Sequence, residues 1–114
     1  MIERRLSKRI PFREPIKYGL HNPTFPGYTC DLSEGGIGVT PTKVFPPDTE
    51  LVIDMYIGDE VIRVEGVVAR VTPIFSEMAS IMGVKFQGRT DHIKHIYMQR
   101  LNNQHNFNKI TEAE

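Results

Sequence analysis

Cysteine, net charge and long apolar runs are all scarce in this chain of 114 residues. Cys30 is its one cysteine, so an internal disulfide is impossible and a reducing compartment is expected. No stretch approaches the ~20 apolar residues that span a bilayer, and the N-terminal residues lack an apolar run of signal-peptide length. We therefore expect one cytoplasmic domain without membrane insertion.

The chain carries no excess of either charge, because 14 Lys and Arg residues balance 14 Asp and Glu residues. A general nucleic-acid binder needs a basic excess to hold the phosphate backbone, so this balance argues against that class. The distribution is uneven, since residues 1–17 hold six basic and two acidic side chains. The sequence favours a local anion site over a broad basic surface.

Alternating apolar residues predict about six β-strands in the middle of the chain. These patterns lie at 16–20, 28–33, 37–40, 51–57, 61–71 and 82–86, with Gly- and Pro-rich turns between them. After residue 89 the spacing becomes helical, with Ile93, Ile96, Tyr97 and Leu101 on one side and Thr90 or Asp91 as the N-cap. Six strands followed by one helix indicate a mainly β fold, a closed antiparallel barrel whose opening the helix could cover.

Two of these strands carry polar residues whose direction matters for function. On 28–33, alternation turns one set toward the core (Tyr28, Cys30, Leu32) and the other set away from it (Thr29, Asp31, Ser33). On 61–71 the apolar pattern changes phase, and a β-bulge at Gly66 would restore it. That bulge would turn Val68 and Arg70 outward. Cys30 is then expected to be a small buried hydrophobe.

Two polar motifs carry the functional prediction. Arg4-Arg5-Leu6-Ser7-Lys8-Arg9 reads RRxxxR, and Asp31-Leu32-Ser33-Glu34-Gly35-Gly36 reads DxSxxG. Guanidinium groups bind phosphates as planar forks, while a carboxylate and a hydroxyl suit the donors of a guanine edge. The pair of motifs resembles the PilZ domain, a bacterial receptor for cyclic di-GMP.

The resemblance covers nearly the whole chain, because Gly83-Val84-Lys85-Phe86 is similar to the family's GVxF before the final helix. It implies a six-stranded PilZ-like β-barrel with a C-terminal α-helix over residues 12–106. A flexible arginine-rich arm at 1–11 and a tail at 107–114 would flank this domain.

The resemblance also implies roles for individual residues. Arg5 and Arg9 would grip ligand phosphate and stack on guanine. Asp31 would accept hydrogen bonds from N1–H and the exocyclic amine of guanine, and Ser33 would bond ligand or loop backbone. Gly36 would permit a tight bend and close approach of the ligand. The structural alternative is a solvated basic arm beside ordinary turn residues.

Arg4 and Arg70 extend this site. Arg70 either reaches the ligand or is a solvated charge on its strand. Arg4 occupies the position before RxxxR, which in the family is linked to holding one ligand or an intercalated pair. Because a pair brings four phosphates together, the cation at Arg4 favours two cyclic di-GMP molecules per chain.

No nucleophile elbow, HExxH motif or Walker loop occurs, so a binding module is expected and not an enzyme, with no cofactor or metal. The arm would order over ligand held on the Asp31/Ser33 face, and a partner protein would read the new surface. One alternative is a ligand-independent PilZ-like adaptor, which would not need both motifs. Another is a small nucleic-acid-binding barrel, which zero net charge and the lack of an exposed aromatic stripe disfavour.

Overall fold

The computed structural model describes residues 8–74 and 79–113, and side chains as far as residue 103. In these residues seven strands precede one helix: β1 (Ile10–Pro11), β2 (Pro15–Gly19), β3 (Phe25–Leu32), β4 (Gly36–Pro41), β5 (Glu50–Ile57), β6 (Glu60–Ile74), β7 (Ala79–Gln87) and α1 (Asp91–Ala113). None of the helical structure described is long and apolar enough to cross a membrane. Mainly β structure followed by a helix was predicted and is confirmed.

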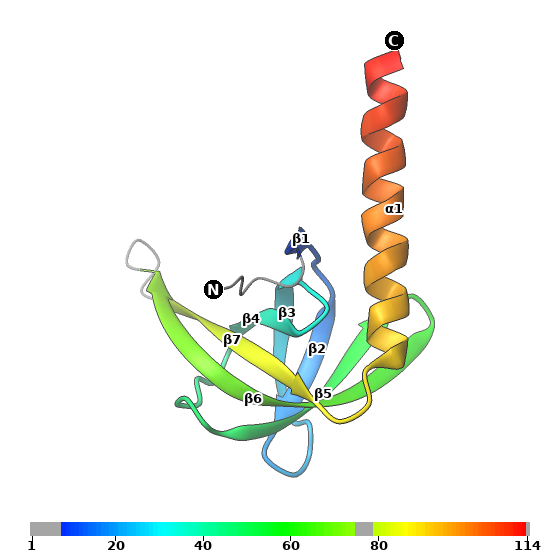
Figure 1. The fold of residues 1–114 in the computed structure, drawn as a ribbon. Helices are drawn as coiled ribbons and strands as arrows, with labels where there is room; N and C mark the ends of the chain where they lie inside the picture. The colour runs from blue at the N-terminus through cyan, green and yellow to red at the C-terminus, as the bar shows by residue number, and fades with distance from the viewer. Residues whose placement is uncertain (1–7, 75–78, 114) are drawn as a thin grey trace, which may run out of the picture.

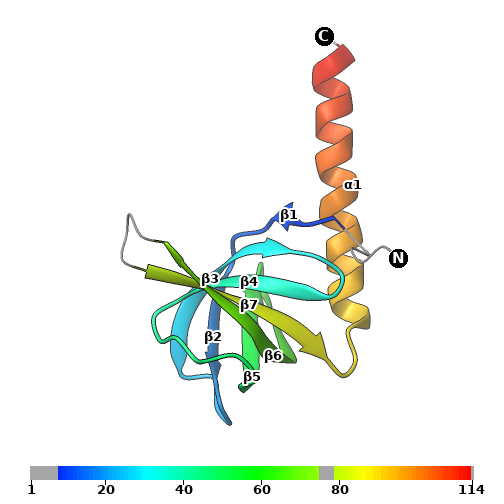
Figure 2. The ribbon, with the colours of Figure 1, turned by 60° about the vertical axis from the view of Figure 1, so that its left-hand side comes forward.

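Six of the strands close into an antiparallel barrel in the order β3–β2–β5–β6–β7–β4, and β4 pairs back with β3 (Figures 1 and 2). The short strand β1 pairs with the end of β3 beyond β2. The predicted six-stranded barrel is therefore confirmed, with β1 as an addition. Closure leaves most strand N–H and C=O groups paired within the ring.

The barrel interior is filled by apolar side chains that alternate along the strands, as the period of two requires. Of the predicted inward residues on β5 and β7, Ile57 is partly buried and the others are buried: Leu51, Ile53, Met55, Met82, Val84 and Phe86. Ile93, Ile96 and Tyr97 of α1 join the same core cluster, with Leu101 packed against it. The helix therefore packs by its first three turns and then projects away from the barrel (Figure 1).

The alternation predicted for β3 is wrong at Tyr28 and Thr29. Tyr28 is 45% exposed and Thr29 is fully buried, while Leu32 faces the core as expected. The register with β4 shifts between Thr29 and Asp31, so Cys30 is the extra residue of a β-bulge. An inserted residue reverses the alternation beyond it, and one strand's own pattern cannot show this.

Thr29 is a buried polar residue that joins β3 to the break between β1 and β2. Its hydroxyl accepts a hydrogen bond from Glu14 N–H at 2.8 Å and donates one to the Phe12 carbonyl at 2.5 Å. Its own N–H donates to the Glu14 carbonyl at 3.0 Å. Residues 12–14, between β1 and β2, do not continue the regular pairing with β3, and these bonds take its place. A hydroxyl at position 29 is therefore a structural requirement.

The bulge predicted at Gly66 lies instead at Ala69, where the register of β6 with β7 shifts between Val68 and Arg70. Val68 is therefore buried, contrary to the prediction, while Arg70 faces outward as predicted. Gly66 sits in regular register, and a Cβ there would lie 2.8 Å from the Lys85 carbonyl oxygen. Its missing side chain lets β7 approach closely.

Two smaller predictions about strand ends are also wrong. Leu20 is 50% exposed just beyond β2, although its parity placed it in the core. Pro73 and Ile74, expected in a loop, extend β6 and pair with β7. The rest of that loop, 75–78, lies outside the described residues.

Helix α1 holds the segment that leads into the barrel. The Tyr97 hydroxyl donates to the Lys8 carbonyl at 2.6 Å. Arg100 forms an ion pair with Glu14 at 2.7 Å, and its guanidinium lies 4.8 Å from the centre of the Phe12 ring. Residues 8–14 are thus fastened between β3 and α1. The helix bounds also include 107–113, which the sequence assigned to a tail.

We expect Thr29→Val, which keeps the side-chain shape, to lower the free energy of unfolding by about 1–3 kcal/mol. The buried Glu14 N–H and Phe12 carbonyl would lose their partner. Urea denaturation measures the effect, and Thr72→Val on the exposed face of β6 is the control, with a change under about 0.5 kcal/mol. Equal stability of the two variants would contradict this role for Thr29.

Candidate functional site

An open cavity of about 290 Å³ lies between the β3–β4 turn and strands β6 and β7. It is lined by Arg9, Ser33, Gly35, Gly36, Ala69, Arg70, Gly83, Val84 and Lys85. Four of the seven predicted site residues are in this lining. They come from three separate parts of the chain, and the barrel brings them together. Arg4 and Arg5 lie outside the described residues.

Asp31, another predicted residue, reaches the cavity through Arg9. Arg9 Nη1 donates to Asp31 Oδ1 at 2.5 Å, and the two side chains are 45% and 35% exposed. An ion pair this accessible adds little to stability, but it orients both groups. The second carboxylate oxygen and the remaining guanidinium donors have no partner among the described residues, so both groups can bind further.

Gly38 makes room for the Asp31 side chain. The two residues face each other across β3 and β4, and a Cβ on Gly38 would lie 2.8 Å from both Asp31 Oδ1 and Cys30 Sγ. Burial and the Asp31 carboxylate raise the pKa of the Cys30 thiol, so it stays protonated and is a poor nucleophile. This contact between Gly38 and Asp31 depends on the pairing of β3 with β4, so neither motif alone predicts it.

Ser33 and Gly36 shape the turn between β3 and β4. Ser33 N–H donates to the Gly36 carbonyl at 2.9 Å, and its hydroxyl lies 3.4 Å from the same oxygen. Ser33 is 7% exposed, so the expectation that it stands clear of the core is wrong. A Cβ on Gly36 would lie 2.6 Å from the Val84 carbonyl oxygen, so close approach of β7 is enough to require glycine there.

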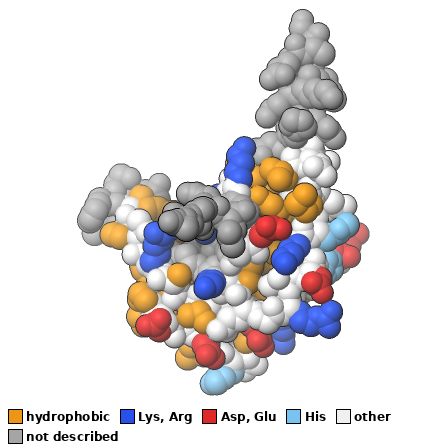
Figure 3. Space-filling model, viewed as in Figure 1, with side chains coloured by type: hydrophobic (Ala, Val, Ile, Leu, Met, Phe, Trp, Pro, Cys, Tyr) orange, Lys and Arg blue, Asp and Glu red, His pale blue; other side chains and the backbone are white. Residues whose placement is uncertain are grey.

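The far wall of the cavity is basic. The bulge at Ala69 places Arg70 opposite Gly83, where a Cβ would lie 3.5 Å from Arg70 Cγ. Lys85 lines the same wall and was missed, although it shares strand parity with Gly83 in the Gly83–Phe86 motif. Arg9, Arg70 and Lys85 thus surround a polar cavity suited to an anion. Elsewhere, basic and acidic side chains are interspersed on the visible face (Figure 3).

The family profile of the PilZ domain matches residues 3–101. This chain therefore belongs to the PilZ family, as the two motifs predicted. No curated protein is significantly similar to it in sequence.

Three solved structures share its fold. The inhibitor of motility (MotI/DgrA) of Bacillus subtilis is 17% identical, with a TM-score of 0.73 over 92% of this chain and 53% of that one. The PilZ domain of YcgR from Escherichia coli, solved with c-di-GMP, is 13% identical, with a TM-score of 0.69 over 98% and 99%. The MrkH–c-di-GMP complex of K. pneumoniae is 22% identical, with a TM-score of 0.59 over 98% and 55%. The chain spans about half the length of MotI and MrkH.

The two neighbouring glycines of DxSxxG should respond differently to alanine. Gly36→Ala should lower the free energy of unfolding by about 1–3 kcal/mol, because the new methyl group meets the backbone of β7. Gly35→Ala should change it by less than about 0.5 kcal/mol, because nothing lies within 4 Å of a Cβ there. Urea denaturation of both variants measures the difference. Equal destabilisation would contradict the assigned role of Gly36.

Proposed function

We propose that this chain is a receptor for cyclic di-GMP, which binds in the cavity between Arg9 and Arg70. The observation that carries the proposal is the lining itself, which joins both motifs and Arg70 in one place. Membership of the PilZ family supports it, as do the structures of YcgR and MrkH, which were solved with c-di-GMP. The chain then works as a binding module and not as an enzyme.

The chemistry of the cavity fits the two parts of this ligand. Each phosphate carries one negative charge, which Arg9, Arg70 and Lys85 can neutralise. Guanine offers N1–H and an exocyclic amine side by side, and the Asp31 carboxylate can accept both. Adenine lacks this pair of donors. Asp31 therefore supplies specificity, while the cations supply most of the affinity.

Part of the arm is already in place in the described structure. Ile10 and Pro11 pair with Leu32 and Asp31 as β1, and the Lys8 carbonyl is bonded to Tyr97. Arg9 is held between these points beside Asp31. In the proposed mechanism the residues before Lys8, with Arg4 and Arg5, close over the ligand and add their charge. A partner protein then reads the closed surface. The ligand-independent adaptor is the alternative.

Arg9→Ala should weaken cyclic di-GMP binding by a factor of about 100. The lost charge-assisted contact to phosphate is worth about 2–3 kcal/mol, and the variant also leaves Asp31 unoriented. Calorimetric titration measures it, beside cyclic di-AMP and GMP, which should bind the parent much more weakly. Arg89→Ala, an exposed cation outside the cavity, should bind like the parent. If Arg9→Ala also binds like the parent, or if cyclic di-AMP binds as well as cyclic di-GMP, the proposed site is wrong.

We also propose that two cyclic di-GMP molecules bind each chain, because Arg4 adds a cation beside the RxxxR arginines. Arg4→Leu should lower the calorimetric stoichiometry from about two toward one, while one ligand still binds through Arg9 and Arg70. Arg4→Lys keeps the charge and should retain the pair. Saturation of the parent protein with a single ligand would contradict the role given to Arg4.

A further inference from the structure

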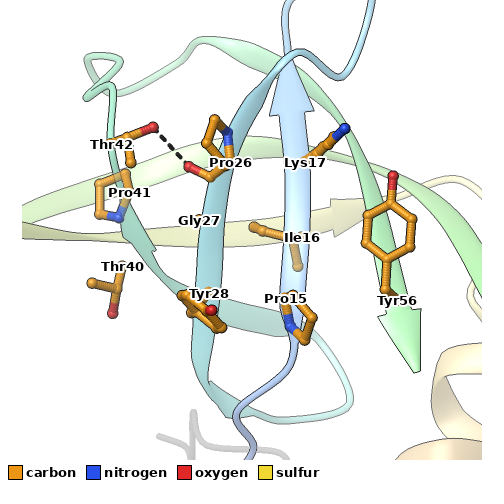
Figure 4. A pocket seen from close by; sticks show the side chains of 10 residues that line it. All are labelled: Pro15, Ile16, Lys17, Pro26, Gly27, Tyr28, Thr40, Pro41, Thr42 and Tyr56. Carbon is orange, nitrogen blue, oxygen red and sulfur yellow. Dashed lines mark hydrogen bonds between the residues drawn. The ribbon is translucent and has the colours of Figure 1, made fainter. Parts of the chain in front are cut away.

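A row of ring and apolar side chains crosses the outer face of the barrel, away from the cavity at Arg9. Pro15 pairs with Tyr28 across β2 and β3, and Tyr56 pairs with Val61 across β5 and β6. The pairing of Ile16 with Met55 places Pro15 next to Tyr56, so all four lie at one level on neighbouring strands. We call these four residues the tyrosine row. Figure 4 shows its first three members.

Three members of the tyrosine row are exposed to solvent, and Tyr56 is half-buried. Tyr28 is 45% exposed and Val61 is 57% exposed, which is unusual for large apolar side chains set in a line. The exposed ring of Tyr28 was not predicted, because its parity assigned Tyr28 to the core. A cavity of about 380 Å³ is lined by Pro15, Tyr28 and Tyr56 of the row, and Pro26 and Pro41 also line it (Figure 4).

The backbone that lines this cavity has few free hydrogen-bonding groups to offer a partner. Pro15, Pro26 and Pro41 have no N–H group, and the Thr42 hydroxyl donates to the Pro26 carbonyl at 2.7 Å. These positions therefore favour contacts through ring surfaces and nearby charges over the addition of a strand.

Two cations beside the row, Lys17 and Arg13, have no acidic partner among the described residues. Lys17 lies opposite Asp54 in register, but Arg63 donates to both oxygens of Asp54, at 2.8 and 3.0 Å. Arg13 stacks on the Tyr28 ring at 4.4 Å. Neither Lys17 nor Arg13 forms an ion pair with any described residue. Two cations beside the row without acidic partners among the described residues favour acidic groups in a molecule that binds there.

The spacing of the rings selects the shape of the partner. Tyr28 and Tyr56 are separated by β2, so two strand spacings of ~4.8 Å place their backbones ~9.6 Å apart. A polyproline II helix advances ~3.1 Å per residue, or ~9.3 Å in a three-residue turn. Prolines at positions i and i+3 of an extended segment would therefore meet the two tyrosines in turn.

We propose that the tyrosine row binds a proline-rich, acidic segment of a partner protein. Its prolines pack on Tyr28 and Tyr56, and its carboxylates pair with Lys17 and Arg13. A single-stranded nucleic acid fits less well, because its phosphates need a continuous basic path, and Asp54 separates Lys17 from Arg63. This site is separate from the cyclic di-GMP cavity and does not depend on it.

Fluorescence polarisation with a labelled peptide of about 12 residues tests the proposal, with Pro at every third position and Asp or Glu between. The parent protein should bind it saturably, and at least ten-fold more tightly than the same peptide with Lys for the acids or Gly for the prolines. Tyr28→Ala and Tyr56→Ala should each weaken binding ten-fold or more. Lys17→Glu should reverse the preference toward the Lys peptide, while Lys94→Glu on the exposed side of α1 should not. Thermal unfolding confirms that each variant is folded.

Three results would overturn the proposal. One is equal binding of the acidic and basic peptides, or no binding of either at about 1 mM. Another is tighter binding of an oligothymidylate than of the acidic peptide, lost in Tyr28→Ala, which would make the row a nucleic-acid site. The third is self-association of the parent in sedimentation experiments that Tyr28→Ala abolishes, which would assign the row to a second copy of this chain.

Discussion

One inserted residue in β3, Cys30, allows the same strand to supply a side chain to the core and another to the candidate site. Thr29 and Asp31 have the same parity, so regular alternation would bury both side chains. A carboxylate taken into the core without a fully desolvated partner would cost several kcal/mol. The bulge at Cys30 reverses the alternation, keeps Thr29 inside and turns Asp31 out over Gly38, within reach of Arg9. The hydroxyl of Thr29 is thus bonded in the core, while the carboxylate of Asp31 faces the candidate site.

A bulge in β6 separates a core residue from a site residue in the same way, on the other side of the cavity. Val68 and Arg70 share parity, and the bulge at Ala69 lets the first remain in the core while the second faces the cavity. A barrel of regular strands would offer no such pocket at this end. Bulges are common where a sheet must redirect a side chain toward a ligand, and here two of them flank one cavity. The site is therefore a consequence of departures from the regular fold.

The sequence was sufficient for what depends on local periodicity. Strands such as β5 and β7 and the packed face of α1 followed from spacing, and Arg9 and Asp31 followed from two compact motifs. The sequence was insufficient where the direction or contact of a side chain depends on pairing with the neighbouring strand. Both bulges, the space that Gly38 leaves and the alignment of Tyr28 with Tyr56 across β2 come from register, which no single segment encodes.

The bond from Tyr97 to the Lys8 carbonyl joins residues 89 positions apart, and Arg100 reaches back to Glu14 over a similar distance. Such long-range closure is slow to form in folding and cannot precede synthesis of the later residue. The segment bearing Arg9 is synthesised early and can pair with β3 once that strand is made, but it gains its contacts with α1 only after the helix has been made. A nascent chain can thus complete much of its barrel while Arg9 is held from one side only, by β3.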